Sequence, residues 1–261
     1  IYTLSLHDAL PIFGARRIKN DFIFKTLHYF KFKEVFFTMK GKSIFFAVVV
    51  IAAASIAMVV YLPRYKAERE GAGLPIEVNK EKGEVVVPAE VNGKYFTNPT
   101  RHGVVFAGGS NGEKSVLRGL ANEAAFHQAL LDIGAKAGEN MTMQDMQAKA
   151  SKDGKAVEGD RLDVFLTWEG SDREIPFADA IRTGKPEDMR PMDIRFGGNL
   201  DNARTFHTGC ILCLDSCAVG ITSNASYPSG TTQGDEVRFF GNDKVLPPDG
   251  TRVSVIFRRV P

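Results

Sequence analysis

A run of uncharged, mostly apolar residues extends from Ser43 to Leu62 and divides the chain in two. In a helix that rises ~1.5 Å per residue, a run of this length matches the ~30 Å hydrocarbon core of a bilayer. Lysine and arginine residues flank both sides almost equally, so charge orients the run only weakly. We predict a signal anchor over residues 39–62 that forms a single transmembrane helix. A cleaved signal peptide is the alternative, with Ser55-Ile56-Ala57 as its cleavage site.

The parts on either side of this run differ in what they contribute to a fold. Residues 2–12 resemble a translated sequencing adapter, and we interpret residues 1–38 as a spurious extension that does not belong to the folded protein. Residues 63–73 are charged and contain glycine, which is typical of a linker. Residues 74–261 are long enough to form one globular domain with an ordinary core.

Charge limits the partners that this domain is expected to have. Before residue 71 the chain has eleven Lys/Arg and five Asp/Glu, whereas from residue 71 onward it has twenty-two and twenty-six. A mildly acidic domain lacks the basic footprint of nucleic-acid binding, so we expect no nucleic-acid partner. The predicted partners are the membrane, through residues 43–62, and redox or metal-handling proteins of the cell envelope. The predicted location is the cell membrane, with a single span and the domain outside the cytoplasm.

Apolar periodicity predicts the fold class of the domain. Short apolar runs between turn residues predict strands at 84–88, 103–107, 162–168, 192–196, 237–240 and 251–258. The last two flank turn sequences and are expected to pair with each other. Helical spacing predicts one main helix at about 115–135 and a short helix at 143–150, and residues 175–181 are interpreted as a strand that runs into a short helix. We expect an α+β domain with a mostly antiparallel sheet.

The only cysteines of the chain, Cys210, Cys213 and Cys217, lie within eight residues of one another. Thiolates are soft ligands and good nucleophiles, so this segment is the predicted functional site. If the segment were helical, the three thiols would share one face. Three thiolates leave one position of a tetrahedral site for a fourth ligand, and His207 is our first choice. Asp215 and His102 are the other candidates for that position.

Several chemistries fit these residues. A zinc-like ion would be held by the three cysteines and His207. An iron–sulfur cluster usually needs a fourth cysteine, which this chain lacks. Cys210 and Cys213 also form a Cys-x-x-Cys pair suited to thiol–disulfide exchange. In the remaining interpretation, two of the cysteines form a structural disulfide in a binding or scaffold module. We find no catalytic constellation and expect the protein not to be an enzyme.

Two other features are interpreted as structural. The glycine-rich segment 108–115 follows a predicted strand, but Glu113 stands where a phosphate-binding loop has glycine, so we interpret it as an ordinary turn. His127 falls on the apolar side of the predicted main helix, where a packed, hydrogen-bonded histidine is expected.

Four segments of the domain resemble the YdjY-like family of bacterial proteins. They are Val85–Gly93, Phe106–Gly112, Phe126–Lys136 and Thr208–Cys217. The resemblance covers nearly all of residues 74–261 and none of the predicted anchor. The resemblance implies an exported or membrane-attached protein, and some members of this family carry a ferredoxin-like description. It supports the predicted domain boundary and the cysteine segment, but it implies no particular reaction.

Overall fold

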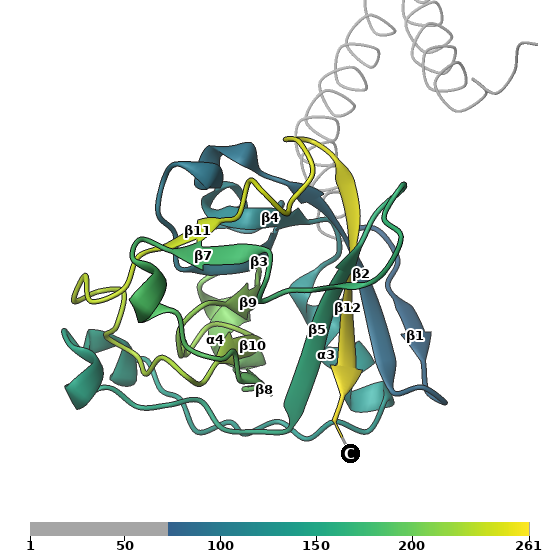
Figure 1. Cartoon of the computed structure of the whole chain (residues 1–261). Coiled ribbons are helices and arrows are strands. Elements are labelled where there is room, and N and C mark those ends of the chain that lie inside the picture. Colours follow the sequence, from purple (N-terminus) through teal and green to yellow (C-terminus); the bar gives the residue numbers. More distant parts are fainter. Residues whose placement is uncertain (1–72, 261) are drawn as a thin grey trace, which may run out of the picture. The chain divides into compact units, whose positions relative to one another are not determined.

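The computed structural model of the protein describes residues 73–260, and most of the regular structure in this part consists of strands (Figure 1). Within it there are two α-helices, α3 (Glu123–Asp132) and α4 (Leu200–Thr205). The α+β prediction is therefore wrong, because the described domain is mostly β. Short 3-10 turns make up the other helical elements: η2 (Gly93–Phe96), η3 (Gly112–Lys114), η4 (Asp145–Gln147), η5 (Ser151–Asp153) and η6 (Pro186–Asp188).

The main sheet closes on itself. Its strands are β1 (Glu77–Asn79), β2 (Glu84–Val91), β3 (His102–Phe106), β4 (Ser115–Gly119), β5 (Arg161–Thr167), β6 (Ile175–Pro176), β8 (Ile194–Phe196), β9 (Cys210–Cys213), β10 (Thr222–Asn224) and β12 (Arg252–Arg259). Hydrogen bonding follows the order β2-β12-β5-β8-β10-β9-β3-β4, and β4 pairs again with β2. Most pairs are antiparallel, but β3–β4 and β9–β10 are parallel. The strands β7 (Ile181–Thr183) and β11 (Phe239–Gly241) form a separate small sheet.

Strand β2 shows how the sequence produces this closure. Its residues alternate between buried and half-buried positions, as expected for a strand with one face in the core. Along one edge, β2 pairs first with β1 up to Val86 and then with β4 from Ala89 onward. Pro88 lies between these two pairings, where its missing N–H breaks no ladder hydrogen bond, and its carbonyl accepts from Leu120 at 2.8 Å.

The predicted main helix at 115–135 is wrong in its first half. Residues Ser115–Gly119 form β4, which is buried on both faces, so its apolar residues show no strand-like alternation. The helix α3 begins only after Asn122, whose side-chain oxygen accepts a hydrogen bond from the backbone N–H of Ala124 at 2.8 Å. The apparent helical spacing therefore came from a doubly buried strand followed by a capped helix.

Other local predictions meet the structure with mixed results. Strands at 84–88, 103–107, 162–168 and 251–258 are confirmed by β2, β3, β5 and β12. The predicted pairing of 237–240 with 251–258 is wrong, because β11 pairs with β7, and β12 pairs with β2 and β5. Residues 175–181 begin with a strand, β6, as predicted, but they continue through a turn into β7 and form no helix. The helix predicted at 143–150 is reduced to η4.

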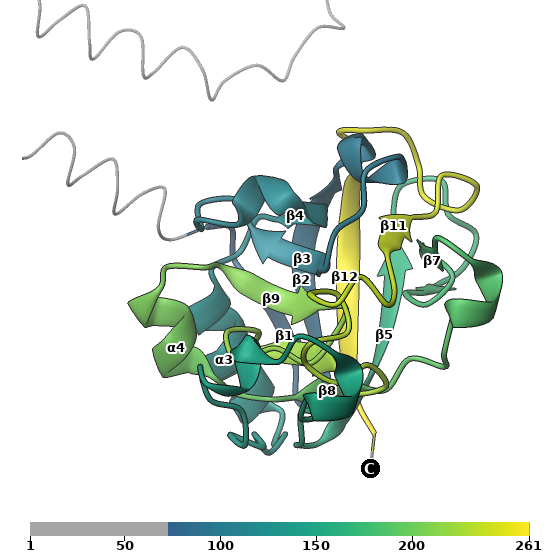
Figure 2. The same cartoon turned by 90° about the vertical axis from the view of Figure 1, so that its left-hand side faces the viewer.

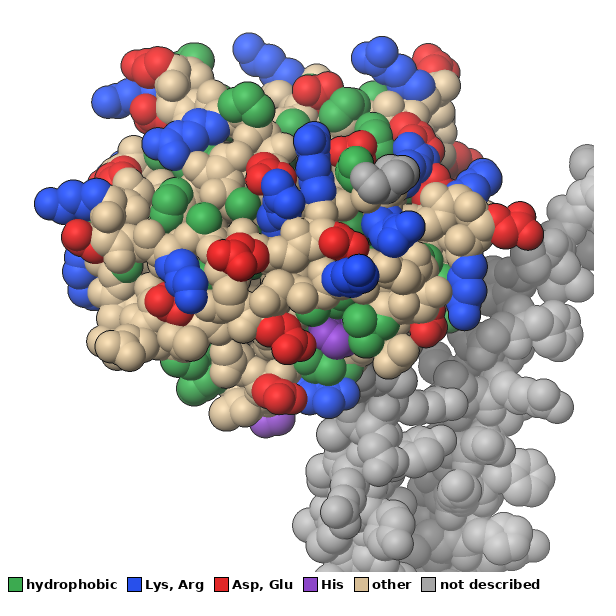
Figure 3. Space-filling view, turned by 90° about the horizontal axis from the view of Figure 1, so that it is seen from below, with side chains coloured by type: hydrophobic (Ala, Val, Ile, Leu, Met, Phe, Trp, Pro, Cys, Tyr) green, Lys and Arg blue, Asp and Glu red, His purple; other side chains and the backbone are tan. Residues whose placement is uncertain are grey.

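The core lies between the closed sheet and its helices, and α3 packs against β12 through the rings of Phe126 and Phe257, 4.6 Å apart. Figure 2 shows α3 and α4 together on one side of the sheet. On the face in Figure 3, acidic and basic side chains are interspersed. Among residues 73–260, no helix combines the length and apolar character needed to cross a bilayer. The span predicted at 43–62 lies outside the described residues.

Candidate metal centre

The first two cysteines lie on a β-strand, β9, and not on a helix. Residues three apart on a regular strand point to opposite faces. In the pairing of β9 with β3, however, Val105 is opposite Cys210 and Val104 is opposite Leu212, so Ile211 is an extra residue on β9. A bulge of this kind re-aims side chains and allows the two thiols to meet.

Three potential ligand atoms converge at this bulge. The sulfur atoms of Cys210 and Cys213 and a ring nitrogen of His102 all lie within 4.8 Å of one another. His102 is directly opposite Cys213 in the β3–β9 pairing, and its Nδ1 lies 3.7 Å from the Cys210 sulfur. The two cysteines are buried and His102 is half-buried. The site is therefore a group of two thiols and one imidazole that lies mostly inside the domain.

Hydrogen bonds among the three thiols shift their pKa values in different directions. Donation from Cys213, and then from His102 and Asn111, holds the pKa of Cys210 well below its usual value, although burial opposes the shift. Cys213 lies between the other two thiols, and its hydrogen bonds to Cys210 and Cys217, together with burial, raise its own pKa. The hydrogen bond from Cys213 also lowers the pKa of Cys217, against burial and with help from Arg101. Cys210 and Cys217 therefore lose their protons more readily than Cys213 does, and the downward shift of the pKa is larger at Cys210.

Cys217 lies beside this group without being one of the three converging atoms. It is held in a turn by Asn199, whose amide donates to the carbonyls of Cys217 at 3.2 Å and Gly220 at 3.1 Å. All three cysteines are free thiols in the structure. Cys217 is therefore placed to interact with Cys213 through a side-chain hydrogen bond.

The other two residues that the sequence offered as a fourth ligand lie elsewhere. His207, the first choice, is exposed, has a positive φ of 49° and is outside the group of converging atoms. Asp215 is fully buried and bound to Arg101 at 2.7 Å. The imidazole that reaches the thiols belongs to His102, which is about a hundred residues away in the sequence and is brought to Cys213 by strand pairing.

Three further residues surround the thiols, and the sequence analysis named none of them as a ligand. Asn111 donates to the Cys210 sulfur at 3.7 Å from the loop that was interpreted as an ordinary turn. Arg101 carries the charge next to Cys217. Met146 packs against the cysteines, and its sulfur accepts from the N–H of Ala218 at 3.2 Å. The composition of 108–115 gave no sign of Asn111, whereas Arg101 stands next to the candidate His102.

One polar atom next to the thiols has no hydrogen-bond partner. Ser223 is fully buried on β10, directly beside Cys213, and its Oγ is unpaired. A Cβ added to Gly220 would lie 2.8 Å from this Oγ and 2.9 Å from the Cys213 sulfur, so both atoms face the same small space. A buried, unpaired donor is costly unless something at the site compensates it. The fit to a thiophilic metal ion comes from the two thiols and the imidazole that converge here, which are soft donors, and not from this hydroxyl.

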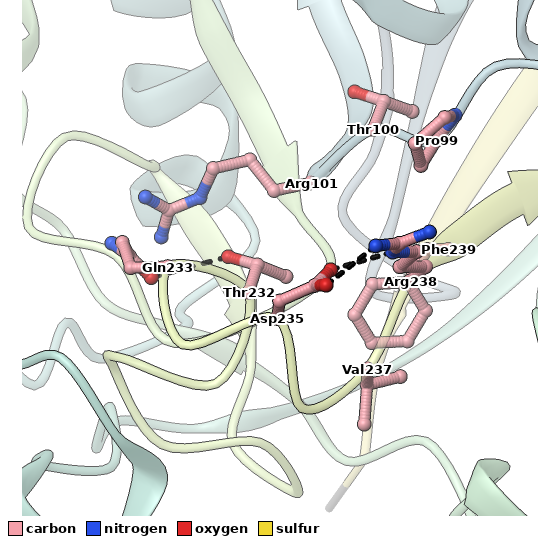
Figure 4. Close-up of a pocket in the computed structure, with 9 residues that line it drawn as sticks. All are labelled: Pro99, Thr100, Arg101, Thr232, Gln233, Asp235, Val237, Arg238 and Phe239. Carbon is pink, nitrogen blue, oxygen red and sulfur yellow. Dashed lines mark hydrogen bonds and ion pairs between the residues drawn. The ribbon is translucent and has the colours of Figure 1, made fainter.

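A surface pocket of about 290 Å³ lies on the other side of Arg101. In Figure 4, the Arg101 side chain extends toward Thr232 and Gln233, while Asp235 pairs with Arg238 at the opposite wall. Arg101 thus lines the pocket and also binds the buried Asp215 of the cysteine segment.

Fold and site together define a closed, mostly antiparallel β domain with a buried thiol–imidazole cluster. Comparison with known proteins gives the family: the model of the YdjY domain matches residues 76–258, and the chain belongs to this family. A relative from Escherichia coli (strain K12), described as "Uncharacterized protein YdjY", is 41% identical over 185 residues, which make up 70% of this chain and 78% of the relative. No solved structure matches the chain.

Proposed function

We propose that this domain binds a single thiophilic metal ion through Cys210, Cys213 and His102, with Cys217 as the nearest additional thiolate. The observation that supports this most is the convergence of two buried sulfurs and one imidazole nitrogen within 4.8 Å. Soft thiolate and imidazole donors suit zinc-like and copper-like ions. The bound ion would serve metal handling or electron transfer.

Burial favours an ion over the other chemistries. Residues Thr208–Asn224 are all buried, so the thiols have no surface through which to exchange with another protein's disulfide. An iron–sulfur cluster usually takes four thiolates, and this chain has three cysteines. The scaffold alternative requires a disulfide, whereas the thiols are free here. We also propose that the domain acts outside the cytoplasm with envelope proteins, on the basis of the uncharged run at 43–62.

The experiment compares two histidines that the structure separates. The full chain and the variants His102→Ala, His207→Ala and Cys210→Ser are purified under reducing conditions and titrated with Zn²⁺ and Co²⁺. We expect one ion per chain, with the ultraviolet charge-transfer bands of Co²⁺–thiolate bonds. Because His102 reaches the thiols and His207 is exposed, His102→Ala should weaken binding at least about 10-fold, the lower end of what loss of a supporting residue costs.

His207→Ala is the matched control and should bind like the unsubstituted chain. If His207→Ala loses the ion and His102→Ala keeps it, the ligand set proposed here is wrong. If no ion binds and the thiols instead form a stable disulfide on mild oxidation, the scaffold or thiol-redox alternative replaces the metal.

A further inference from the structure

Three methionines lie close together in the sequence, and one of them packs against the cysteine cluster. Of the seven methionines in the whole chain, three fall within one segment of six residues: Met141, Met143 and Met146. Met143 is 37% exposed, whereas Met141 is buried. Met146 is half-buried and packs against two clusters, one formed by the three cysteines with Val105 and Val219 and one that contains Met141. This segment therefore places one thioether at the surface, at Met143, and another against the cysteine cluster, at Met146.

Local hydrogen bonds hold this segment in place. The Asp145 carboxylate accepts from the backbone N–H of Thr142 at 2.7 Å and from its hydroxyl at 2.8 Å. These bonds close the turn that carries Met143 and Met146. The Met146 sulfur is fixed by the N–H of Ala218, the residue that follows Cys217. Met146 therefore presents its thioether beside the proposed site in a defined position.

The chemistry of these donors distinguishes between metals. Thioethers bind soft ions such as Cu⁺ and have little affinity for Zn²⁺. Structural zinc takes four ligands, but only three ligand atoms converge within 4.8 Å in the described part of the chain, and Cys217, the nearest further thiol, is not among them. A monovalent soft cation is satisfied by two or three soft donors. Two thiolates, an imidazole and an adjacent thioether thus fit Cu⁺ better than Zn²⁺.

We propose that the ion is Cu⁺, that Met146 is an additional soft donor of its site, and that Met143 is where the ion first binds. This inference rests on the proposed metal-binding function and specifies its metal. Cu⁺ would pass from one thioether to the next and end on thiolate, the stronger ligand, with no change of oxidation state.

The test is an anaerobic competition between the full chain and the Cu⁺ chelator bicinchoninate, with parallel Zn²⁺ titrations. Met146→Leu removes the thioether and nearly conserves the side-chain volume, so the fold should tolerate it. We expect it to weaken Cu⁺ binding about 10-fold, as loss of a supporting donor does, and to leave Zn²⁺ binding unchanged. Met143→Leu should slow Cu⁺ uptake without changing the final affinity. Met192→Leu, a half-buried methionine packed on the main core, is the matched control and should change neither.

Competition between the two metals on the unsubstituted chain needs no variant. If Zn²⁺ displaces Cu⁺, or if Met146→Leu weakens both metals equally or neither, the assignment of Cu⁺ is overturned while metal binding itself stands. If His102→Ala and Cys210→Ser leave both metals unaffected, the proposed function itself fails.

Discussion

At the scale of single residues, the ion pair between Arg101 and Asp215 anchors the cysteine segment to the start of β3. Asp215 is fully buried, and its Oδ1 accepts from Arg101 Nε at 3.1 Å and Nη2 at 2.7 Å. Its Oδ2 accepts from the Thr232 hydroxyl at 2.5 Å. Burial would lower the pKa of Arg101, but the negative charge of Asp215, with a smaller contribution from Cys217, outweighs burial and raises the pKa. Asp215 is thus occupied by a structural partner and is not free to bind an ion.

Asp215→Asn should therefore destabilise the domain. The amide keeps the shape of the carboxylate but leaves the Arg101 charge without its buried counterion, at a cost of about 3 kcal/mol. Urea unfolding of the metal-free chain measures the loss. Asp235→Asn breaks the exposed pair with Arg238 and serves as the matched control, because exposed pairs contribute little. Equal losses in the two variants would show that the Asp215 pair is no more important than a surface contact.

At the scale of elements, the loop between β3 and β4 forms one wall of the site. Its backbone N–H groups at Ser110 and Asn111 donate to the carbonyls of His207 at 2.7 Å and Thr208 at 3.3 Å. The contact is so close that a Cβ on Gly109 would lie 2.6 Å from the Cα of Gly209. This backbone-on-backbone packing keeps Asn111 against Cys210 and separates the thiols from solvent.

Gly109→Ala should open this wall. Backbone atoms cannot move aside as a flexible side chain does, so the loop must lift away from Gly209. A loss of about 1.4 kcal/mol in the free energy of local opening would make the cysteines react about tenfold faster with a thiol reagent. Gly184→Ala is the control, since its Cβ would meet nothing closer than 3.7 Å. Unchanged labelling in Gly109→Ala would mean that the thiols are reached by another route.

The same elements explain how far the sequence could predict the structure. Alternation in β2 and β5 is visible in the sequence because each strand has one buried face. Strands β4 and β9 are buried on both faces, and such strands cannot be distinguished from helix by periodicity. Which strands pair is a long-range property, and turn residues after β11 suggested a hairpin that does not form.

The site, like the fold, was predictable only where its residues lie close together in the sequence. The three thiols lie close together in sequence, so their proximity was expected. The bulge at Ile211 and the pairing of β3 with β9 bring His102 to the thiols. Neither feature can be recognised from the local sequence. His207 was preferred because it is near in sequence, but the left-handed turn at His207 leaves its side chain exposed.

At the scale of the whole molecule, α3 is joined to the closed sheet through two aromatic contacts. Phe126 packs on Phe257 of β12, and His127 meets Phe196 of β8 edge-on, with ring centroids 5.2 Å apart. Burial lowers the pKa of His127, and Arg204 adds to this effect while Glu139 and Asp201 oppose it. The neutral imidazole is therefore the form that the folded domain prefers.

This preference gives the stability of the domain a pH dependence with a defined sign. The imidazole has a pKa of about 6.5 in the unfolded chain and a lower one in the fold. Between these two pKa values the unfolded chain binds more protons than the folded chain does. The free energy of unfolding therefore falls as the pH drops below about 6.5, and the stabilisation from the neutral imidazole is lost once the pH has fallen through the folded pKa. His127→Gln cannot titrate and should lose less stability between about pH 7.5 and about pH 5.5 in urea unfolding than the unsubstituted chain does. The unsubstituted chain is the reference for this slope. If His127→Gln shows the same slope as the unsubstituted chain, the contact between α3 and β8 does not depend on a neutral imidazole.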